Sequence, residues 1–289
     1  FMLSADIGTT SIRCHVYDKG ANIRGSCTTK VLISHSTTDT NPFLCNICLN
    51  RVTVGILMLI IFLQVVPLYP KVGYVEMNPD AIWKGFISVA KGAVQDAGVQ
   101  MHQIEALGIS TQRGTFTTWD RKTGDTFHNF ISWQDQRATD LVKSWNRSCT
   151  LKVVHGLMKL VYFLSRQNRC LAASLIVFTT QHVTMRLVWV LTHYKQVRQA
   201  VADGNCCFGT IDTWLLFKLT KGRVHATDYS NASSTGIFDS YQMCWSQFLC
   251  SLVSLPLSIF PKVEDTGNEF GCTDPSIFGA SIPIMSVVG

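Results

Sequence analysis

The segment from residue 78 to 98 constrains the fold most, because it reads as one long helix beside predicted strands. Asn78 can cap a helix, Pro79 suits its first turn, and Asp80 complements the positive end of its dipole. Apolar residues then recur at helical spacing until Gly98, namely Ile82, Phe86, Val89, Ala90, Ala93, Val94 and Ala97. Residues 104–110 and 115–119 read as two strands, which we expect to form a hairpin around Arg113 and Gly114. A helix that packs on strands predicts an α/β fold.

The chain opens with a predicted strand, a glycine turn and a second strand. An apolar lead-in ends at Asp6, Gly8-Thr9-Thr10-Ser11 follows, and residues 14–17 resume an extended pattern. Glycine lets backbone N–H groups approach a phosphate, hydroxyls add donors, and a nearby carboxylate can hold Mg²⁺ directly or through water. The turn therefore suggests nucleotide chemistry, although Gly-Thr-Thr also suits an ordinary hairpin.

Composition indicates a packed globular protein and argues against nucleic acid as a partner. A length of 289 residues fits one large or two ordinary domains, and 47% hydrophobic with 15% charged residues suffices for a core. The net charge of +6 has no long run of Lys or Arg behind it. Nucleic acid is therefore not an expected partner, and anionic small molecules fit better.

Cysteine usage and the apolar runs indicate a cytoplasmic protein. The 11 cysteines are irregularly spaced and no secretory leader precedes Asp6, so we expect reduced, buried thiols. Cys45 and Cys48 have the spacing of a zinc half-site, but no second Cys/His pair follows, so we expect no structural metal. The apolar run at residues 54–63 is shorter than the roughly 20 residues of a spanning helix, so we expect no membrane partner.

Polar side chains follow the predicted strands. Gln112 and Arg113 stand at the exit of the first of them, and ligands of α/β folds gather beyond the carboxyl ends of strands. After another strand-like stretch, Trp133, Asp135 and Arg137 fall within five residues. Trp133 could simply fill the core. Alternatively, a Trp, an acid and an Arg together could bind a polyhydroxylated ligand.

Three later elements are also predicted from local patterns. A helix should begin at about Ala138, residues 210–220 read as a buried helix, and residues 227–235 read as a polar loop.

Five segments, in this order, resemble motifs of the FGGY carbohydrate kinases and, within that family, of its glycerol kinase branch. They are residues 6–13, 73–79, 109–113, 133–137 and 209–239. The last segment is long and specific, and the match covers most of the chain outside residues 31–64. The resemblance implies an α/β, ribonuclease-H-like N-terminal domain of the actin-like ATPase type. Two such domains enclose a cleft in that family, with the polyol mostly on the first and ATP mostly on the second.

The resemblance also implies a role for individual residues. Asp6 would position Mg²⁺, and Arg13 would support the turn in which Gly8, Thr9, Thr10 and Ser11 face the ATP phosphates. The polyol would contact Gln112, Arg113, Trp133 and Asp135. The implied reaction is in-line transfer of the γ-phosphoryl group to a primary hydroxyl, which needs positioning, charge neutralisation and a carboxylate that accepts the hydroxyl proton.

The sequence departs from the glycerol kinase pattern at the expected polyol site. Gly114 follows Arg113 where glycerol kinases usually have Glu, and Gln181 stands where a substrate-contacting Tyr would fall. The family's Lys-x-x-Trp appears as Arg186-Leu187-Val188-Trp189. Glycerol, another polyol or no polyol therefore remain open as substrates. The alternative function is that of a non-catalytic kinase-like protein that binds a ligand or another protein.

Residues 281–289 resemble the strand that leads to the family's Gly-Asp-Gln motif, whose Asp is the expected catalytic base. The sequence stops at Gly289, one position before that Asp, and the ATP-binding second domain is absent from it. We therefore expect residues 1–289 to be an N-terminal domain fragment that does not catalyse phosphoryl transfer by itself.

Residues 31–64 interrupt the family pattern, and we expect them to be a translated intron. Val31 is encoded by GTN and Gln64 can be encoded by CAG, which match the two ends of an intron. The apolar run between them fits the T-rich coding of a pyrimidine tract. A functional insertion that binds a membrane or a partner is the rival interpretation.

Overall fold

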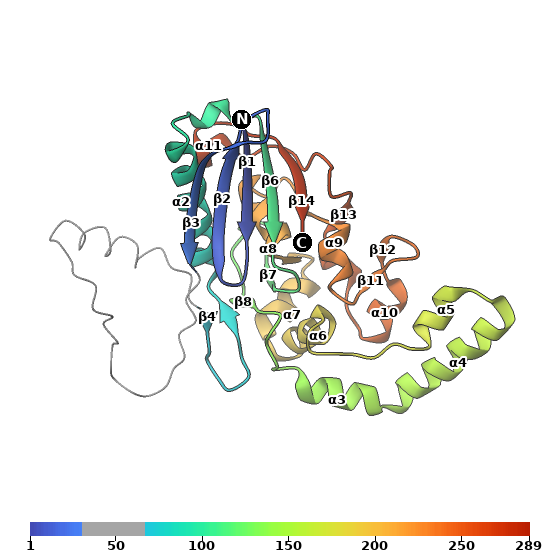
Figure 1. Cartoon of the computed structure of the whole chain (residues 1–289). Coiled ribbons are helices and arrows are strands. Elements are labelled where there is room, and N and C mark those ends of the chain that lie inside the picture. The colour runs from blue at the N-terminus through green and yellow to red at the C-terminus, as the bar shows by residue number, and fades with distance from the viewer. Residues whose placement is uncertain (31–66) are drawn as a thin grey trace, which may run out of the picture.

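A computed structural model describes residues 1–30 and 67–289 (Figure 1). Its first sheet has the strand order β14-β6-β1-β2-β3. The bounds of these strands are β1 (Met2–Ile7), β2 (Ser11–Tyr17), β3 (Ile23–Lys30), β6 (Ala106–Thr111) and β14 (Ile284–Val288). Within the sheet, β1, β6 and β14 run parallel, whereas β2 pairs antiparallel with both β1 and β3. The carboxyl ends of three strands therefore lie at one edge.

The opening strand–turn–strand prediction is confirmed. β1 pairs with β2 so that Asp6 lies opposite Arg13 and Ile7 lies opposite Ile12. Side chains alternate along β1, with Leu3, Ala5 and Ile7 buried and the residues between them exposed. This alternation leaves Asp6 exposed near the end of the strand.

The predicted helix is also confirmed, as α2 (Pro79–Asp96). The Asn78 side chain caps it by accepting hydrogen bonds from the backbone N–H groups of Asp80, at 2.8 Å, and Ala81, at 3.2 Å. The helix packs closely on the first sheet where β3 carries Gly25. A Cβ at Gly25 would lie only 2.4 Å from the Ala93 carbonyl oxygen and from the Ala97 nitrogen. Glycine is therefore what allows this approach.

The predicted hairpin between residues 104–110 and 115–119 is wrong. A second sheet has the order β4-β5-β8-β7-β9, with β4 (Pro67–Leu68), β5 (Glu76–Met77), β7 (Phe116–Asp120), β8 (Phe130–Ile131) and β9 (Cys206–Thr210). β7 belongs to this sheet, whereas β6 belongs to the first. The Gln112 N–H donates to the Ile7 carbonyl at 2.8 Å, so the chain continues along β1 before it crosses to the other sheet.

Helices and two small ribbons complete the described residues. The remaining α-helices are α3 (Thr139–Arg147), α4 (Cys149–Ser165), α5 (Asn168–Ala173), α6 (Val183–His193), α7 (Lys195–Ala202), α8 (Ile211–Leu219), α9 (Tyr229–Ser233), α10 (Gln247–Leu252) and α11 (Pro275–Phe278). Short 3₁₀ turns span Met101–Gln103 and Leu257–Ile259. β10 (Ala226–Asp228) pairs with β13 (Lys262–Glu264), and β11 (Phe238–Asp239) pairs with β12 (Cys244–Trp245).

Of the three predictions for later segments of the chain, the two helices are confirmed and the loop is wrong. α8 confirms the buried helix at residues 210–220, and α3 begins at Thr139, next to the predicted start. The polar loop predicted at residues 227–235 is wrong, because β10 ends there and α9 follows. Asp228 begins α9 by accepting hydrogen bonds from the N–H groups of Ser230, at 2.9 Å, and Asn231, at 3.0 Å. Short polar residues that favour loops also favour helix caps.

Across residues 1–30 and 67–289, no helix is both long and apolar enough to cross a bilayer. The predictions made for Cys45, Cys48, the apolar run at 54–63 and the insertion at 31–64 concern residues outside these ranges.

Candidate active site

A cleft of about 530 Å³ opens at the edge of the first sheet where β1, β6 and β14 end. Thr9, Gln112, Arg113 and Trp133 line it together with Gly289. Four residues that the sequence singled out for phosphate or polyol contact are thus brought to one place, although they come from three different parts of the chain. The edge at which parallel strands end is where α/β proteins bind ligands.

The turn after β1 is fixed by hydrogen bonds at both ends. The Gly8 N–H donates to the Ser11 carbonyl at 2.9 Å, which closes the turn. Arg13 Nε donates to Ser11 Oγ at 3.0 Å, so Arg13 contacts the turn that it was predicted to support. Thr9 Oγ1 donates to Gln112 Oε1 at 2.8 Å and ties the turn to the segment after β6.

Asp6 lies just before this turn and Thr10 lies within it, and both are exposed. Groups of three or more His, Cys, Asp or Glu side chains that could hold a metal are absent from residues 1–30 and 67–289. Mg²⁺, however, is usually held by one or two carboxylates together with substrate phosphates and water. The single exposed carboxylate of Asp6 beside a glycine turn fits that mode, and it does not fit an all-protein metal cage.

A buried arginine fixes the wall of the cleft. Arg186 is completely buried, and its guanidinium donates to four backbone carbonyls. Nη1 donates to Ser132 at 2.7 Å and to Ile131 at 3.3 Å, and Nη2 donates to Gln181 at 2.8 Å and to Gly114 at 2.9 Å. Arg186 therefore fixes the relative positions of three segments of the cleft wall, which lie before β7, after β8 and before α6.

Sequence reasoning noted Arg186 only as a departure from a family pattern and gave it no role. No local signal marks its function, because its four acceptors are main-chain carbonyls from three distant segments. Burial, together with the nearby charge of Arg137, lowers the pKa of Arg186 to about 10, and the charge of Asp135 acts in the opposite direction. The side chain is still protonated at neutral pH and can donate to all four oxygens.

Gly114 lies in the left-handed region, with φ of +70°, at the point where the chain leaves β6 for β7. A Cβ there would lie 3.5 Å from the Cβ of Trp133 and 3.6 Å from the Gln181 carbonyl, which are ordinary contacts. The backbone conformation rather than lack of space therefore favours glycine at this position.

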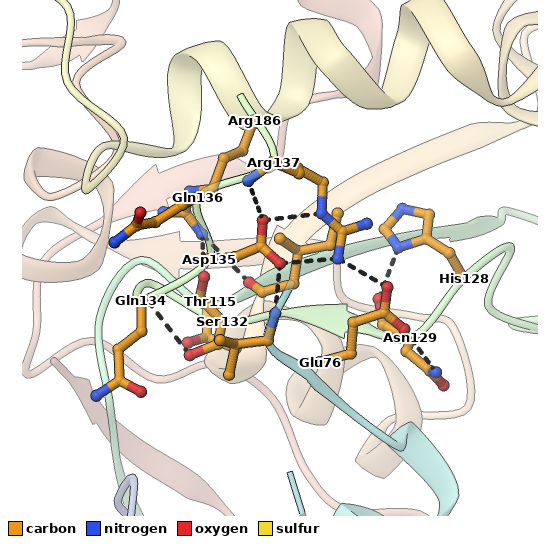
Figure 2. Close-up of polar contacts among 12 residues, drawn as sticks. Glu76, Thr115, His128, Asn129, Ser132, Gln134, Asp135, Gln136, Arg137 and Arg186 are labelled. Carbon is orange, nitrogen blue, oxygen red and sulfur yellow. Dashed lines mark hydrogen bonds and ion pairs between the residues drawn. The ribbon is translucent and has the colours of Figure 1, made fainter. Parts of the chain in front are cut away.

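Asp135 does not line the cleft, although it was predicted to contact the polyol. It is completely buried, and Figure 2 shows its carboxylate directed at Arg137. Arg137 Nε and Nη2 each donate to it at 2.8 Å, and Nη2 also donates to Glu76 Oε1 at 2.7 Å. The Val75 N–H donates to Asp135 at 2.6 Å. The geometry thus places Asp135 in a network that joins β5 to the segment carrying Trp133.

Aromatic rings cover the same network. The Arg137 guanidinium lies 4.3 Å from the centre of the Tyr74 ring and 5.2 Å from that of Trp189. Burial alone would lower the pKa of Arg137, but its hydrogen bonds and charge contacts with Asp135 and Glu76 raise it above the ordinary value. Arg137 is therefore a permanent cation that contacts two carboxylates, the buried one of Asp135 and the partly buried one of Glu76.

The end of β14 is packed against α9 on the other side of the cleft. The Gly289 N–H donates to Ser230 Oγ at 2.7 Å. A Cβ at Gly289 would lie 2.6 Å from Asn231 Oδ1 and 2.8 Å from Arg113 Cγ, so only glycine fits without movement. Asp228 holds this arrangement, because it accepts from both Ser230 Oγ, at 2.6 Å, and Asn231 Nδ2, at 2.9 Å. Sequence reasoning missed this support because it interpreted the segment as a loop.

A model of the FGGY family of carbohydrate kinases, N-terminal domain, matches residues 63–289, well over half of the chain. The chain belongs to the FGGY family. Among curated FGGY relatives, glycerol kinase 5 of Danio rerio is 62% identical over 288 residues and that of Homo sapiens is 49% identical. A glycerol kinase of Borreliella afzelii is 31% identical over 289 residues. Each alignment covers 100% of this chain and 48% of the relative, so the chain spans about half the length of these relatives.

Solved structures of glycerol and xylulose kinases share the fold. The crystal structure of Plasmodium falciparum glycerol kinase with ADP superposes with a TM-score of 0.72 at 23% identity, covering 100% of this chain and 48% of that one. A xylulose kinase from Rhodospirillum rubrum gives 0.69 at 17% identity, covering 99% and 48%. The chain thus has the N-terminal-domain fold of these FGGY kinases, an actin-like ATPase fold, as its sequence predicted.

Proposed function

We propose that the protein carrying this chain transfers the γ-phosphoryl group of ATP to a hydroxyl of glycerol or a related polyol, in the cytoplasm. The observation that carries this proposal is the single cleft at which the glycine turn after β1, Arg113 and Trp133 meet. Membership of a carbohydrate kinase family supports phosphoryl transfer as the reaction class. The names of the curated relatives favour glycerol over a sugar.

In this proposal the two sides of the cleft bind different substrates. Arg113 and Gln112 donate hydrogen bonds to polyol hydroxyls, and the exposed Trp133 ring packs against the carbon chain. The turn at Gly8 faces the phosphates with its backbone N–H groups and the Thr10 hydroxyl, and the Asp6 carboxylate holds Mg²⁺. Bound Mg²⁺ supplies neutralisation of the charge that develops on the phosphoryl oxygens.

Asp135 has a positioning role rather than a binding one. Its carboxylate fixes Arg137, and through the short segment between them it sets where Trp133 stands. The buried Arg186 fixes the same segment through the Ser132 carbonyl. Both residues act on the polyol side of the cleft without touching the ligand.

Residues 1–289 are, in this proposal, the N-terminal domain of a two-domain kinase. The general base and most of the ATP site belong to residues that follow Gly289 in the complete protein. That Gly289 lines the cleft supports a general base at the position that follows it. The chain by itself should bind polyol weakly and should not turn over.

Gly114 broadens the choice of polyol. Glycerol kinases usually have a carboxylate side chain at this position, and a carboxylate that accepts substrate hydroxyls rejects analogues that lack them. Without that acceptor, discrimination rests on Gln112 and Arg113. We therefore expect measurable activity on polyols one or two carbons longer than glycerol.

The test is an ADP-release assay on the full-length protein with glycerol, erythritol, xylitol and D-xylulose as acceptors. The proposal predicts ADP release that depends on Mg²⁺ and on at least one of the four, with the phosphorylated acceptor detected by mass spectrometry. A folded protein that binds ATP but releases no ADP with any polyol would refute the proposal and favour the binding-protein alternative.

A further inference from the structure

Helix α4 extends away from the two sheets, at the far end of an arm formed with α3 and α5 (Figure 1). One face of α4 is anchored within this arm. Leu151 is 2% exposed, and His155 Nε2 donates to the Ile176 carbonyl at 2.9 Å. The face of α4 opposite Leu151 and His155 has no packing partner among the described residues.

The opposite face carries a stripe of large apolar side chains that we call the α4 ridge. It consists of Val153, Leu157, Leu160 and Leu164, which are 59%, 53%, 56% and 75% exposed. Their spacing of four, three and four residues places them on one side of the helix. Phe163 lies beside them and is 66% exposed. An apolar stripe this long and this exposed marks an interaction surface rather than scattered surface residues.

A row of cations runs parallel to the ridge. Lys152 and Lys159 are seven residues apart, which places them along one flank of the stripe, and Arg166 is the C-cap residue directly after the helix. All three are exposed. None of them makes an ion pair with any residue that the structure describes. Arg166 lies over the Phe163 ring, 5.3 Å from its centre.

The charge of the surrounding sequence has one sign. Residues 141–202 contain nine Lys or Arg residues and no Asp or Glu. Arg169 of α5 is paired with Asp239 at 2.8 Å, so it is already neutralised, unlike Lys152, Lys159 and Arg166. The ridge therefore lies in a field that attracts anions.

We propose that α4 binds the surface of an anionic phospholipid bilayer, with the ridge in the interface and Lys152, Lys159 and Arg166 at the headgroups. A helix with an apolar face flanked by Lys and Arg lies in the plane of a membrane rather than across it. The 17 residues of α4 are about 25 Å long, which gives the ridge room for contact along its whole length. This proposal is independent of the proposed kinase activity.

Charge complementarity favours a lipid surface over a second copy of the chain. Two copies that met through this face would bring the two cation rows together, with no acidic residue in 141–202 to neutralise them. An anionic bilayer supplies negative charge over an area as wide as the arm, and each Lys or Arg near such a surface adds to the attraction.

The experiment is co-sedimentation of the full-length protein with vesicles of phosphatidylcholine, alone or mixed with about one-third phosphatidylserine. We expect binding to the mixed vesicles at low salt, at least about tenfold weaker binding to phosphatidylcholine alone, and loss of binding at high salt. Hydrogen exchange of the α4 amides should slow when mixed vesicles are added, which identifies the contact.

Two variants test the two halves of the surface. Leu157→Gln/Leu164→Gln should abolish binding, and Lys152→Gln/Lys159→Gln/Arg166→Gln should reduce it at least about tenfold. The matched controls are Val72→Gln/Leu257→Gln and Lys19→Gln/Lys84→Gln/Lys91→Gln, which change exposed residues elsewhere and should bind as the parent does.

Three results would overturn the proposal. The first is no binding to the mixed vesicles, and the second is binding that all four variants retain equally. The third is dimerisation through the ridge, or capture by an acidic protein such as Ca²⁺-loaded calmodulin, in a chain that does not bind vesicles. Sedimentation without vesicles controls for aggregation.

Discussion

Arg137 is the residue whose removal should most damage the wall of the cleft proposed to bind the polyol. Arg137→Ala would leave the buried carboxylate of Asp135 and the partly buried carboxylate of Glu76 without their shared cation. Breaking a buried pair in this way costs about 3–5 kcal/mol. Urea denaturation should show a loss of that size, whereas Lys143→Ala, which removes an exposed ion pair with Asp140, should change the free energy of unfolding by less than about 1 kcal/mol. Equal effects of the two variants would contradict the network's role.

Buried titratable residues set the dependence of stability on pH. Burial lowers the pKa of His128 and of His225 to about 4, and burial raises the pKa of Asp212 to about 6. Near pH 5 the two histidines are therefore protonated in the unfolded chain but neutral in the native state. Asp212 shows the opposite behaviour, because it is protonated in the native state and ionised in the unfolded chain. The free energy of unfolding should fall as the pH falls, by about 1 kcal/mol per pH unit.

Asp212→Asn removes the group whose protonation in the native state partly offsets the effect of the two histidines on the pH dependence of unfolding. The slope near pH 5 should then become about twice as steep, because two protons rather than one favour the unfolded state. Urea denaturation between pH 6 and about pH 4.5 measures both slopes. A variant with the parent slope would show that Asp212 does not titrate in this range.

At the scale of single elements, close approach between α2 and β3 depends on Gly25. Gly25→Ala should separate the two elements and destabilise the chain by about 1–3 kcal/mol, the usual range for overpacking. Gly156→Ala is the matched change, because nothing lies within 4 Å of a Cβ there and the residue is in the exposed helix α4. It should stabilise by up to about 1 kcal/mol. Thermal melting distinguishes the two, and destabilisation by both would contradict the packing argument.

Elements with their own local signal were predictable. The cap, proline and apolar spacing of α2 are all local, and so are the turn and strands at Asp6 to Arg13. The partners of β6 were not predictable, because they are β1 and β14, far away in the sequence, rather than the neighbouring β7. Asp228 shows a second limit, since a polar run ending in small residues fits a loop and a capped helix equally well.

At the scale of the whole molecule, the resemblance to a kinase family predicted the residues of the cleft better than local patterns of hydrophobicity and turn residues did. The packing of the two sheets and α6 brings together Thr9, Arg113 and Trp133. Only the resemblance to a kinase family, and no local pattern, predicts that these residues share a cleft. The buried placement of Asp135 and the four carbonyl contacts of Arg186 depend on that same assembly. No spacing along the chain encodes them.

Residues 31–64 directly follow β3 and overlap the family match, which begins at residue 63, by two residues. We propose that they are a translated intron and not part of the kinase domain. Transcript sequencing should find messages in which codon 30 joins directly to codon 65. Consistent retention of the segment in spliced messages from several tissues would contradict this and favour a functional insertion.

The most direct test of the account is the kinetics of Arg113→Ala in the full-length protein. Arg113 lines the cleft on the side proposed to bind the polyol, so the variant should raise KM for the polyol at least about tenfold, the cost of a charge-assisted hydrogen bond. KM for ATP should stay within about twofold, and Arg24→Ala, an exposed arginine outside the cleft, should resemble the parent. An equal loss for polyol and ATP, or no loss for either, would contradict the central claim that this cleft is the polyol half of a kinase.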